Sequence, residues 1–159
     1  MRHVISVLVE NKFGVLARIA GLFSARGYNI DSLAVGETDD PRFSRMTVVV
    51  HGDDRIINQV KRQLGKLIEV IEVKDLAPGR YVERDLVLVK VRYGQENREK
   101  VDSIIDKFHL EITDIVGDSV ILQVVGEEEF VESALEELKS VEIEDIARTG
   151  TIALDKGEG

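Results

Sequence analysis

The same order of strand-like and helix-like segments occurs twice in this chain, and this repeat limits the possible fold more than any other feature. In the first half, runs rich in Val, Ile and Leu alternate with two amphipathic stripes in the order β-α-β-β-α-β. Strands are expected at 2–10, 29–37, 43–51 and 67–74, and helices at 15–26 and from a cap at Asp53 or Asp54 to Gly65.

The second half repeats this order after Ala77, Pro78 and Gly79, which are typical of a boundary between domains. Strands are expected at 85–93, 110–116, 119–125 and 141–148, and helices at 101–108 and 130–138. Gly117 and Asp118 indicate a hairpin. We therefore predict a first domain at 1–77, a linker at 78–84 and a second domain at 85–159, whose polar tail ALDKGEG should fray.

Each β-α-β-β-α-β unit most simply forms a four-stranded antiparallel sheet with both helices on one face. The predicted class is therefore α+β, with two tandem ferredoxin-like βαββαβ domains. The second face of each sheet would be uncovered, although the strands contain too many Val, Ile and Leu for that face to be very polar. Such a face, or an edge strand, favours pairing with a partner.

Cysteine is absent, which excludes disulfides, thiolate nucleophiles and cysteine metal sites and is compatible with a reducing cytoplasmic location. No apolar run approaches the roughly 20 residues that cross a bilayer, so we expect no membrane partner. The opening MRHVISVLVENK is too short and too soon polar for a signal peptide.

The net charge of −9 is unevenly distributed. Residues 1–78 carry 11 Lys/Arg against 10 Asp/Glu, a balance of +1, and the remaining residues carry 10 against 20, a balance of −10. A half with this negative charge would repel phosphate backbones, so we expect no nucleic-acid partner. An RNA-binding domain of this fold would also need exposed aromatic residues on its third strand, where FSRMTVVVH offers only Phe43.

Candidates for catalysis or metal binding are few. Antiparallel pairing of the first and third strands could bring His3 near His51, but two histidines alone make a poor metal site. His109 is expected at a helix end, and the acidic run 127–129 suits the N-terminus of a helix without any bound metal. Phosphate-loop, nucleophile-elbow and zinc-protease motifs are all absent from the sequence.

One enzyme class remains as an alternative. Acylphosphatases share this fold type and use an anion-binding loop between the first strand and first helix, with a nearby Arg and Asn. Residues 14–18 offer such a loop together with Arg18, and Asn29 offers an amide. We expect Arg18 to lie on the solvent-facing side of its helix.

The junction between the first strand and first helix has the composition of a small-molecule site. Gly14 would leave the backbone N–H groups of a helix N-terminus open to a carboxylate. Asn11 and Asn29 add neutral donors and acceptors, and three residues add apolar surface: Val15, Leu16 and Ile30. This set suits a small zwitterion with an aliphatic side chain. The same residues also suit an ordinary helix start, with Asn11 in a turn.

Several longer segments resemble one family. They are SVLVENKFGVLARIAGLFSARGYNIDSLAV, TDDPRFSRMTVVV, KRQLGKLIEVIEV, YVERDLVLVKV and DIARTG, and they cover nearly all of 1–92 and return at 145–150. The first domain resembles the ACT domain, an amino-acid-sensing module. The combination of GYNI, DDPxxSRMT and VERDLxLVKV more narrowly resembles the small regulatory subunits of acetolactate synthase (acetohydroxyacid synthase).

The resemblance implies a homodimer without an active site or cofactor of its own. It implies a catalytic partner subunit that uses thiamine diphosphate, Mg²⁺ and FAD, and that becomes sensitive to a branched-chain amino acid, most often valine. The effector would lie between two ACT domains. One chain would supply Asn11, Gly14, Val15 and Leu16, and its partner would supply Asn29 and Ile30. A free-standing ACT-type sensor with another target is the main alternative.

Overall fold

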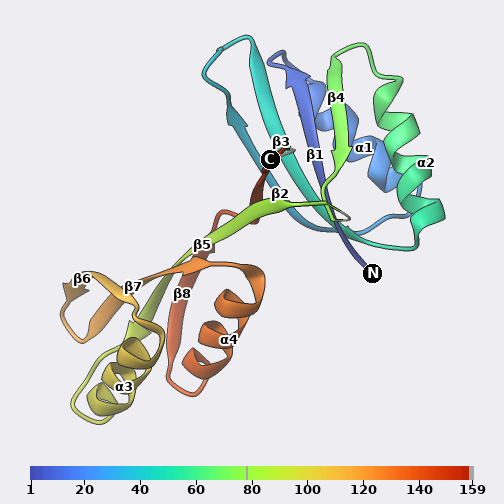
Figure 1. Ribbon diagram of the computed structural model, residues 1–159. Coiled ribbons are helices and arrows are strands. Elements are labelled where there is room, and N and C mark those ends of the chain that lie inside the picture. Colours follow the sequence, from blue (N-terminus) through green and yellow to red (C-terminus); the bar gives the residue numbers. More distant parts are fainter. Residues whose placement is uncertain (78, 158–159) are drawn as a thin grey trace. The chain divides into compact units, whose positions relative to one another are not determined.

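The computed structural model describes residues 1–77 and 79–157, and the chain divides into two compact units (Figure 1). One unit comprises residues 1–82 together with the segment from Thr151 onward, and the other comprises residues 83–150. Pro78, in the linker that we predict at 78–84, lies outside the described residues, and a strand begins within that stretch at Tyr81. The C-terminal segment therefore belongs to the first unit although it follows the second in sequence.

The first unit has the predicted β-α-β-β-α-β order. Its elements are β1 (Arg2–Glu10), α1 (Val15–Ala25), β2 (Ile30–Glu37), β3 (Phe43–His51), α2 (Asp54–Gly65) and β4 (Val70–Asp75). The strands form an antiparallel sheet in the order β2-β3-β1-β4, and α1 and α2 pack on one face of it (Figure 1). β4 begins three residues later than predicted because the chain first turns at the end of α2, where the N–H of Val70 donates to the carbonyl of Leu67.

The core of the first unit follows from the alternation of side chains along its two central strands. Ile5, Val7 and Val9 of β1 lie on the helix-covered face, and Phe23 of α1 is fully buried against them. Burial of one such aromatic side chain stabilises the fold by about 1.5–3 kcal/mol. The other buried members of this cluster are Val15, Ile19, Met46, Val48, Val50, Ile57, Val60 and Leu64.

The second unit repeats the architecture, as predicted. Its elements are β5 (Tyr81–Arg92), α3 (Arg98–Phe108), β6 (Glu111–Val116), β7 (Ser119–Gly126), α4 (Glu128–Leu138) and β8 (Ile143–Arg148), with sheet order β6-β7-β5-β8. Val116 pairs with Ser119 around Gly117 and Asp118, which confirms the predicted hairpin. The two helices close an aliphatic core over one face of this sheet.

A buried carboxylate joins the two sequence segments of the second unit that resemble the family, YVERDLVLVKV and DIARTG. Asp85, 3% exposed, forms an ion pair with Arg148 and lies 3.5 Å from the hydroxyl of Thr149. Burial opposes the charge of Arg148, but its hydrogen bonds with Asp85 and Glu132 outweigh that effect and raise its pKa. The two motifs therefore form one charged cluster between β5 and the end of β8.

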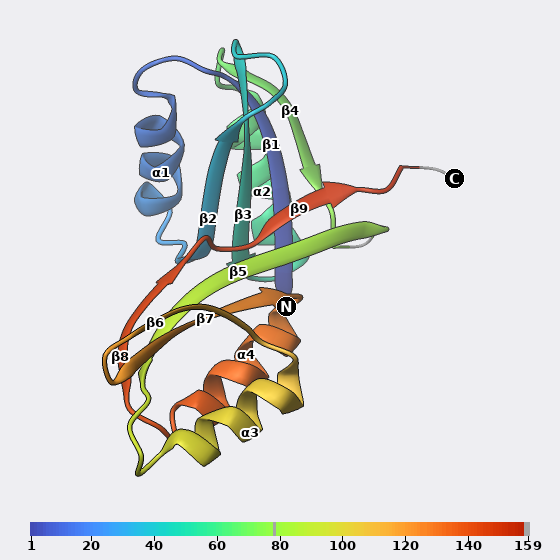
Figure 2. The same ribbon diagram turned by 90° about the vertical axis from the view of Figure 1, so that its left-hand side faces the viewer.

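The prediction that the tail frays is wrong for its first residues. Residues from Ile152 to Asp155 form a further strand, β9 (Ile152–Asp155), which contacts β1 and β3 on the sheet face opposite α1 and α2 (Figure 2). Ala153 is 7% exposed and packs with Val4 and Val49, and the N–H of Thr151 donates to the Ser32 hydroxyl over 2.8 Å. Residues 158–159 of the tail lie outside the described residues.

The face that we expected to be uncovered in the first unit is thus partly covered by the chain itself. Val4 and Val49 pack against Ala153 and Leu76. Lys74 of β4 also lies 3.4 Å from a carboxylate oxygen of Asp155, at the end of β9. The sequence pattern did not indicate this strand because the segment has only four residues and only one of its side chains is buried.

We predict that Ala153→Asp destabilises the first unit by at least about 2 kcal/mol, because it places a carboxylate among aliphatic side chains. Leu154→Asp is the matched control, since Leu154 is 64% exposed and its replacement should change stability by less than about 0.5 kcal/mol. Urea unfolding of both variants measures the difference. Equal stability of the two would mean that β9 does not pack on the sheet in solution.

Candidate functional site

The β1–α1 junction leaves the N-terminus of a helix open. Gly14 is the N-cap of α1 and has a left-handed backbone with φ of 83°. A Cβ at this position would meet no atom within 4 Å, so the space beside it is open. The first helical hydrogen bond runs from the N–H of Arg18 to the carbonyl of Gly14 over 3.0 Å. The three preceding N–H groups, at residues 15–17, therefore have no helical partner.

The N-terminal end of α1 favours an anion. The first turn of α1 carries no acidic side chain, so no carboxylate within that turn neutralises the positive end of the helix dipole. Arg18, at the end of the turn, lies 2.6 Å from a carboxylate oxygen of Glu69. The junction can thus offer backbone N–H groups to a small carboxylate, as helix N-termini commonly do.

Asn11 is bound to the turn between β2 and β3. Its backbone N–H donates to the carbonyl of Arg42 over 2.7 Å. Its side-chain nitrogen Nδ2 donates to Glu37 Oε1 over 3.0 Å and to the Pro41 carbonyl over 3.1 Å. Both amide hydrogens are therefore engaged, which leaves the side-chain oxygen Oδ1 as the group available to a ligand.

The turn at 38–42 is held by its own hydrogen bonds. The N–H of Asp40 donates to the Thr38 hydroxyl over 3.1 Å, and the Asp40 carboxylate accepts from the backbone and guanidinium N–H groups of Arg42. The hydrogen bond from the Arg42 side chain, followed by that from its backbone, lowers the pKa of Asp40. Asn11 is therefore anchored to an ordered turn.

The apolar residues predicted at this junction differ in their exposure. Val15 is 4% exposed and its side chain belongs to the core, so only its backbone N–H can face a ligand. Leu16 is 46% exposed and offers apolar surface beside Gly14. Phe13, which the sequence reasoning did not include, is fully exposed at the same junction. Its position in the sequence, between Asn11 and Gly14, could have indicated that it lies at this junction.

Asn29 and Ile30 lie at the other end of α1. The helix closes with a C-terminal motif in which Gly27 has φ of 72° and the N–H of Tyr28 donates to the Phe23 carbonyl over 3.1 Å. The 11 residues of α1 span about 16 Å at 1.5 Å per residue. The two junctions are thus separated by the length of the helix.

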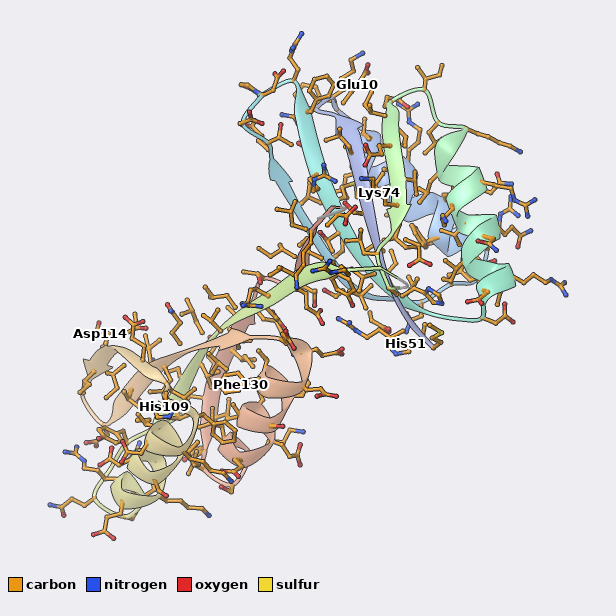
Figure 3. All side chains as sticks on the ribbon, viewed as in Figure 1. Glu10, His51, Lys74, His109, Asp114 and Phe130 are labelled. Atoms are coloured by element: carbon orange, nitrogen blue, oxygen red, sulfur yellow. The ribbon has the colours of Figure 1, made fainter. Side chains whose placement is uncertain are left out.

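The sheet register gives the same separation. Ile30 pairs with Val50, which pairs with His3, whereas Glu10, next to Asn11, pairs with Phe43. Glu10 and His51 mark these opposite ends of the sheet in Figure 3. The structure therefore brings Asn11, Gly14 and Leu16 together, but it does not bring Asn29 and Ile30 to them within one chain.

The histidine pair does not form. His3 lies opposite Val50 and His51 opposite Arg2, and because successive side chains of a strand point to opposite faces, the two rings are on different sides of the sheet. His3 is buried with Nδ1 3.0 Å from Asp75, and His51 pairs with Asp31. Within residues 1–77 and 79–157, no group of three or more His, Asp or Glu side chains could hold a metal ion.

The expected residues are found at the ends of α3 and α4. His109 is the C-cap of α3, and Glu127 is the N-cap of α4, with Glu128 and Glu129 in its first turn, as predicted. The acylphosphatase alternative would need a loop at 14–18 close to Asn29, but residues 15–18 form the first turn of α1 and Asn29 lies beyond the other end of that helix. None of the helices in the described part of the chain has the length and apolar character needed to cross a membrane.

Comparison with known proteins gives concordant matches over both units. Residues 5–72 match the family described as AHAS small subunit-like ACT domain, and residues 84–157 match the family described as small subunit of acetolactate synthase. A relative from Archaeoglobus fulgidus named probable acetolactate synthase small subunit is 45% identical over 99% of this chain and 98% of its own length. The Salmonella typhimurium acetolactate synthase isozyme 3 small subunit is 40% identical over the same shares.

A solved structure agrees with these sequence matches. The crystal structure of the small subunit of acetolactate synthase from Thermotoga maritima superposes with a TM-score of 0.89 at 36% identity, covering 100% of this chain and 99% of that one. The similarity extends over the whole length of both proteins. The chain therefore belongs to the acetolactate synthase small-subunit family, and its first unit contains an ACT domain.

Proposed function

We propose that this chain is a non-catalytic regulatory subunit that binds the catalytic subunit of acetolactate synthase, raises its activity and makes it sensitive to valine. Membership of the small-subunit family over the whole chain supports this proposal. In this proposal the catalytic subunit holds thiamine diphosphate, Mg²⁺ and FAD and condenses pyruvate with pyruvate or 2-oxobutyrate. The present chain contributes effector recognition.

The observation that carries the proposal is the open N-terminus of α1 beside Asn11. A valine carboxylate at this point would accept hydrogen bonds from the N–H groups of residues 15–17, beside the open space that Gly14 leaves because it has no side chain. The ammonium group would donate to Asn11 Oδ1, and the isopropyl group would contact Leu16, which is 46% exposed. Each of the three parts of a branched-chain amino acid thus has a matching group.

The separation of the two junctions explains why the proposed site needs two chains. Asn29 and Ile30 follow the C-terminal end of α1, so they lie too far from its N-terminal end to complete the site of their own protomer. In a homodimer with twofold symmetry, the junction that contains Asn29 can face Asn11 and Gly14 of the partner, which generates two equivalent sites. Valine would then stabilise the dimer geometry in which the halves meet, and by linkage it would bias the catalytic subunit by about 1–3 kcal/mol.

Reconstitution tests the function directly. Adding the purified chain to an acetolactate synthase catalytic subunit should raise the rate of acetolactate formation, and valine should reverse the increase, with a change of about 5- to 150-fold expected for a coupling of this size. The measurement is acetolactate formed from pyruvate with and without valine. A chain that binds valine but neither co-purifies with the catalytic subunit nor alters its rate would be a free-standing sensor instead.

Gly14→Leu should abolish valine binding, because its side chain would fill the open space beside the helix N-terminus. The left-handed backbone also makes this substitution cost about 1–2 kcal/mol of stability. Gly117→Leu is the matched control, since Gly117 also has positive φ, of 58°, and open space around it but lies in the second unit. Calorimetric titration with valine should show binding only in the control, and retained binding by Gly14→Leu would remove Gly14 from the site.

Asn29→Ala should weaken valine binding by about 1–3 kcal/mol, the loss expected for one hydrogen bond to a charged group. A heterodimer of Asn29→Ala with Gly14→Leu, purified through two different tags, tests whether the halves come from different chains. It contains one intact site and should bind one valine per dimer with wild-type affinity. A heterodimer as defective as both parent homodimers would place Asn29 and Gly14 in the same site of one protomer.

A further inference from the structure

Glu37 was not indicated by any sequence motif, yet it touches the candidate site. It is the last residue of β2, and its carboxylate accepts a hydrogen bond from Asn11 Nδ2 over 3.0 Å although 26 positions separate the two residues. The Pro41 carbonyl accepts the second hydrogen from the same nitrogen over 3.1 Å. We propose that Glu37 is a positioning residue that orients Asn11 so that the site accepts an ammonium group and rejects a 2-oxo or 2-hydroxy acid. This inference rests on the proposed function.

The orientation of the Asn11 amide follows from the chemistry of its two partners. A carboxylate and a peptide carbonyl are both acceptors, and neither can donate a hydrogen bond. Rotation of the amide by 180° would place Oδ1 against both oxygens and leave two hydrogen bonds unmade. Glu37 and Pro41 therefore hold Nδ2 toward the turn, and Oδ1 is the only polar atom of the side chain that can meet a ligand.

The remaining anchor points make this orientation rigid. The backbone N–H of Asn11 donates to the Arg42 carbonyl over 2.7 Å, so the main chain is fixed to the same turn as the side chain. Thr38 and Asp40 order that turn from within. Asn11 is thus bound to the end of β2 and to the turn that follows it through three hydrogen bonds, and Glu37 supplies the only charged group among their acceptors.

A site whose polar side-chain atom can only accept selects ligands that donate. The ammonium group of valine donates to Oδ1, whereas the keto oxygen of the corresponding 2-oxo acid would place one acceptor against another. A hydroxyl can donate one hydrogen bond to Oδ1, but it lacks the positive charge that makes an ammonium hydrogen bond stronger. Unpaired polar groups in a binding site cause strong discrimination between otherwise similar ligands. Because acetolactate synthase acts on 2-oxo acids, this polarity would stop compounds of substrate type from occupying the effector site.

Three ligands of the same carbon skeleton test the inference: valine, 2-oxoisovalerate and 2-hydroxyisovalerate. We expect the wild-type full-length protein to bind the 2-oxo acid at least about 100-fold more weakly than valine in calorimetric titrations. In Glu37→Ala the amide can rotate at lower cost. Valine affinity should then fall about tenfold, while the affinity for the 2-oxo acid should stay unchanged or rise.

Two further variants separate positioning from general damage. Glu37→Gln retains an oxygen that can accept from Asn11 Nδ2, so its preference for valine should stay within about threefold of wild type. Asp39→Ala removes a negative charge from the same turn and should leave the ratio of affinities unchanged. Circular dichroism should be the same for all four proteins, because Glu37 and Asp39 are both exposed.

The possible failures are distinguishable. An equal loss of affinity for all three ligands in Glu37→Ala would mean that Glu37 has only a structural role, and it would overturn this inference alone. An unchanged valine preference in Glu37→Ala would do the same. If the wild-type protein binds none of the three ligands under conditions in which it is dimeric, the proposed function fails, and the role of Glu37 fails with it.

Discussion

The antiparallel pairing of β1 with β3 is the constraint on which the rest of the first unit depends. Its register places Glu10 opposite Phe43 at one end and Arg2 opposite His51 at the other. A shift by one residue would move every side chain to the opposite face and expose Ile5 and Val7. The same register brings Asn11 beside the turn at 38–42, where the backbone of Asn11 continues the hydrogen bonding through the Arg42 carbonyl.

This pairing also separates the two halves of the proposed effector site. β1 ends at Glu10, next to Asn11, at one end of the sheet, and β2 begins after Asn29 at the other end, with α1 connecting the two. A single chain therefore has an anion-attracting helix start without the second junction near it. The proposed need for a partner follows from the topology, because a helix of this length cannot have both its ends at one point. The need arises despite β9, which covers part of the free sheet face from within the chain.

Most of the secondary structure could be predicted because the pattern of apolar residues is regular. The strands β1 and β3 have the predicted bounds, and Asp53 caps α2 by accepting from the N–H of Ile56 over 2.9 Å. The predictions failed where long-range contacts override local pattern. β9 forms because Ala153 packs against an apolar surface made by Val4 and Val49, which lie more than 100 positions earlier in the chain. His3 and His51 do not meet because neighbouring positions on adjacent strands can face opposite sides of a sheet.

The sequence by itself determined the two βαββαβ repeats, the glycine that opens the start of α1 and the resemblance to a family of regulatory subunits. These features depend on local spacing, on the backbone freedom of one residue and on motifs read in order along the chain. Only the tertiary structure decided which side chains surround Asn11, since Glu37 reaches it through a strand and a turn whose pairing no local pattern specifies. The side chain of Val15 packs in the core with Ile19 and Phe23, as their helical spacing favours, because the helix buries one face against the sheet.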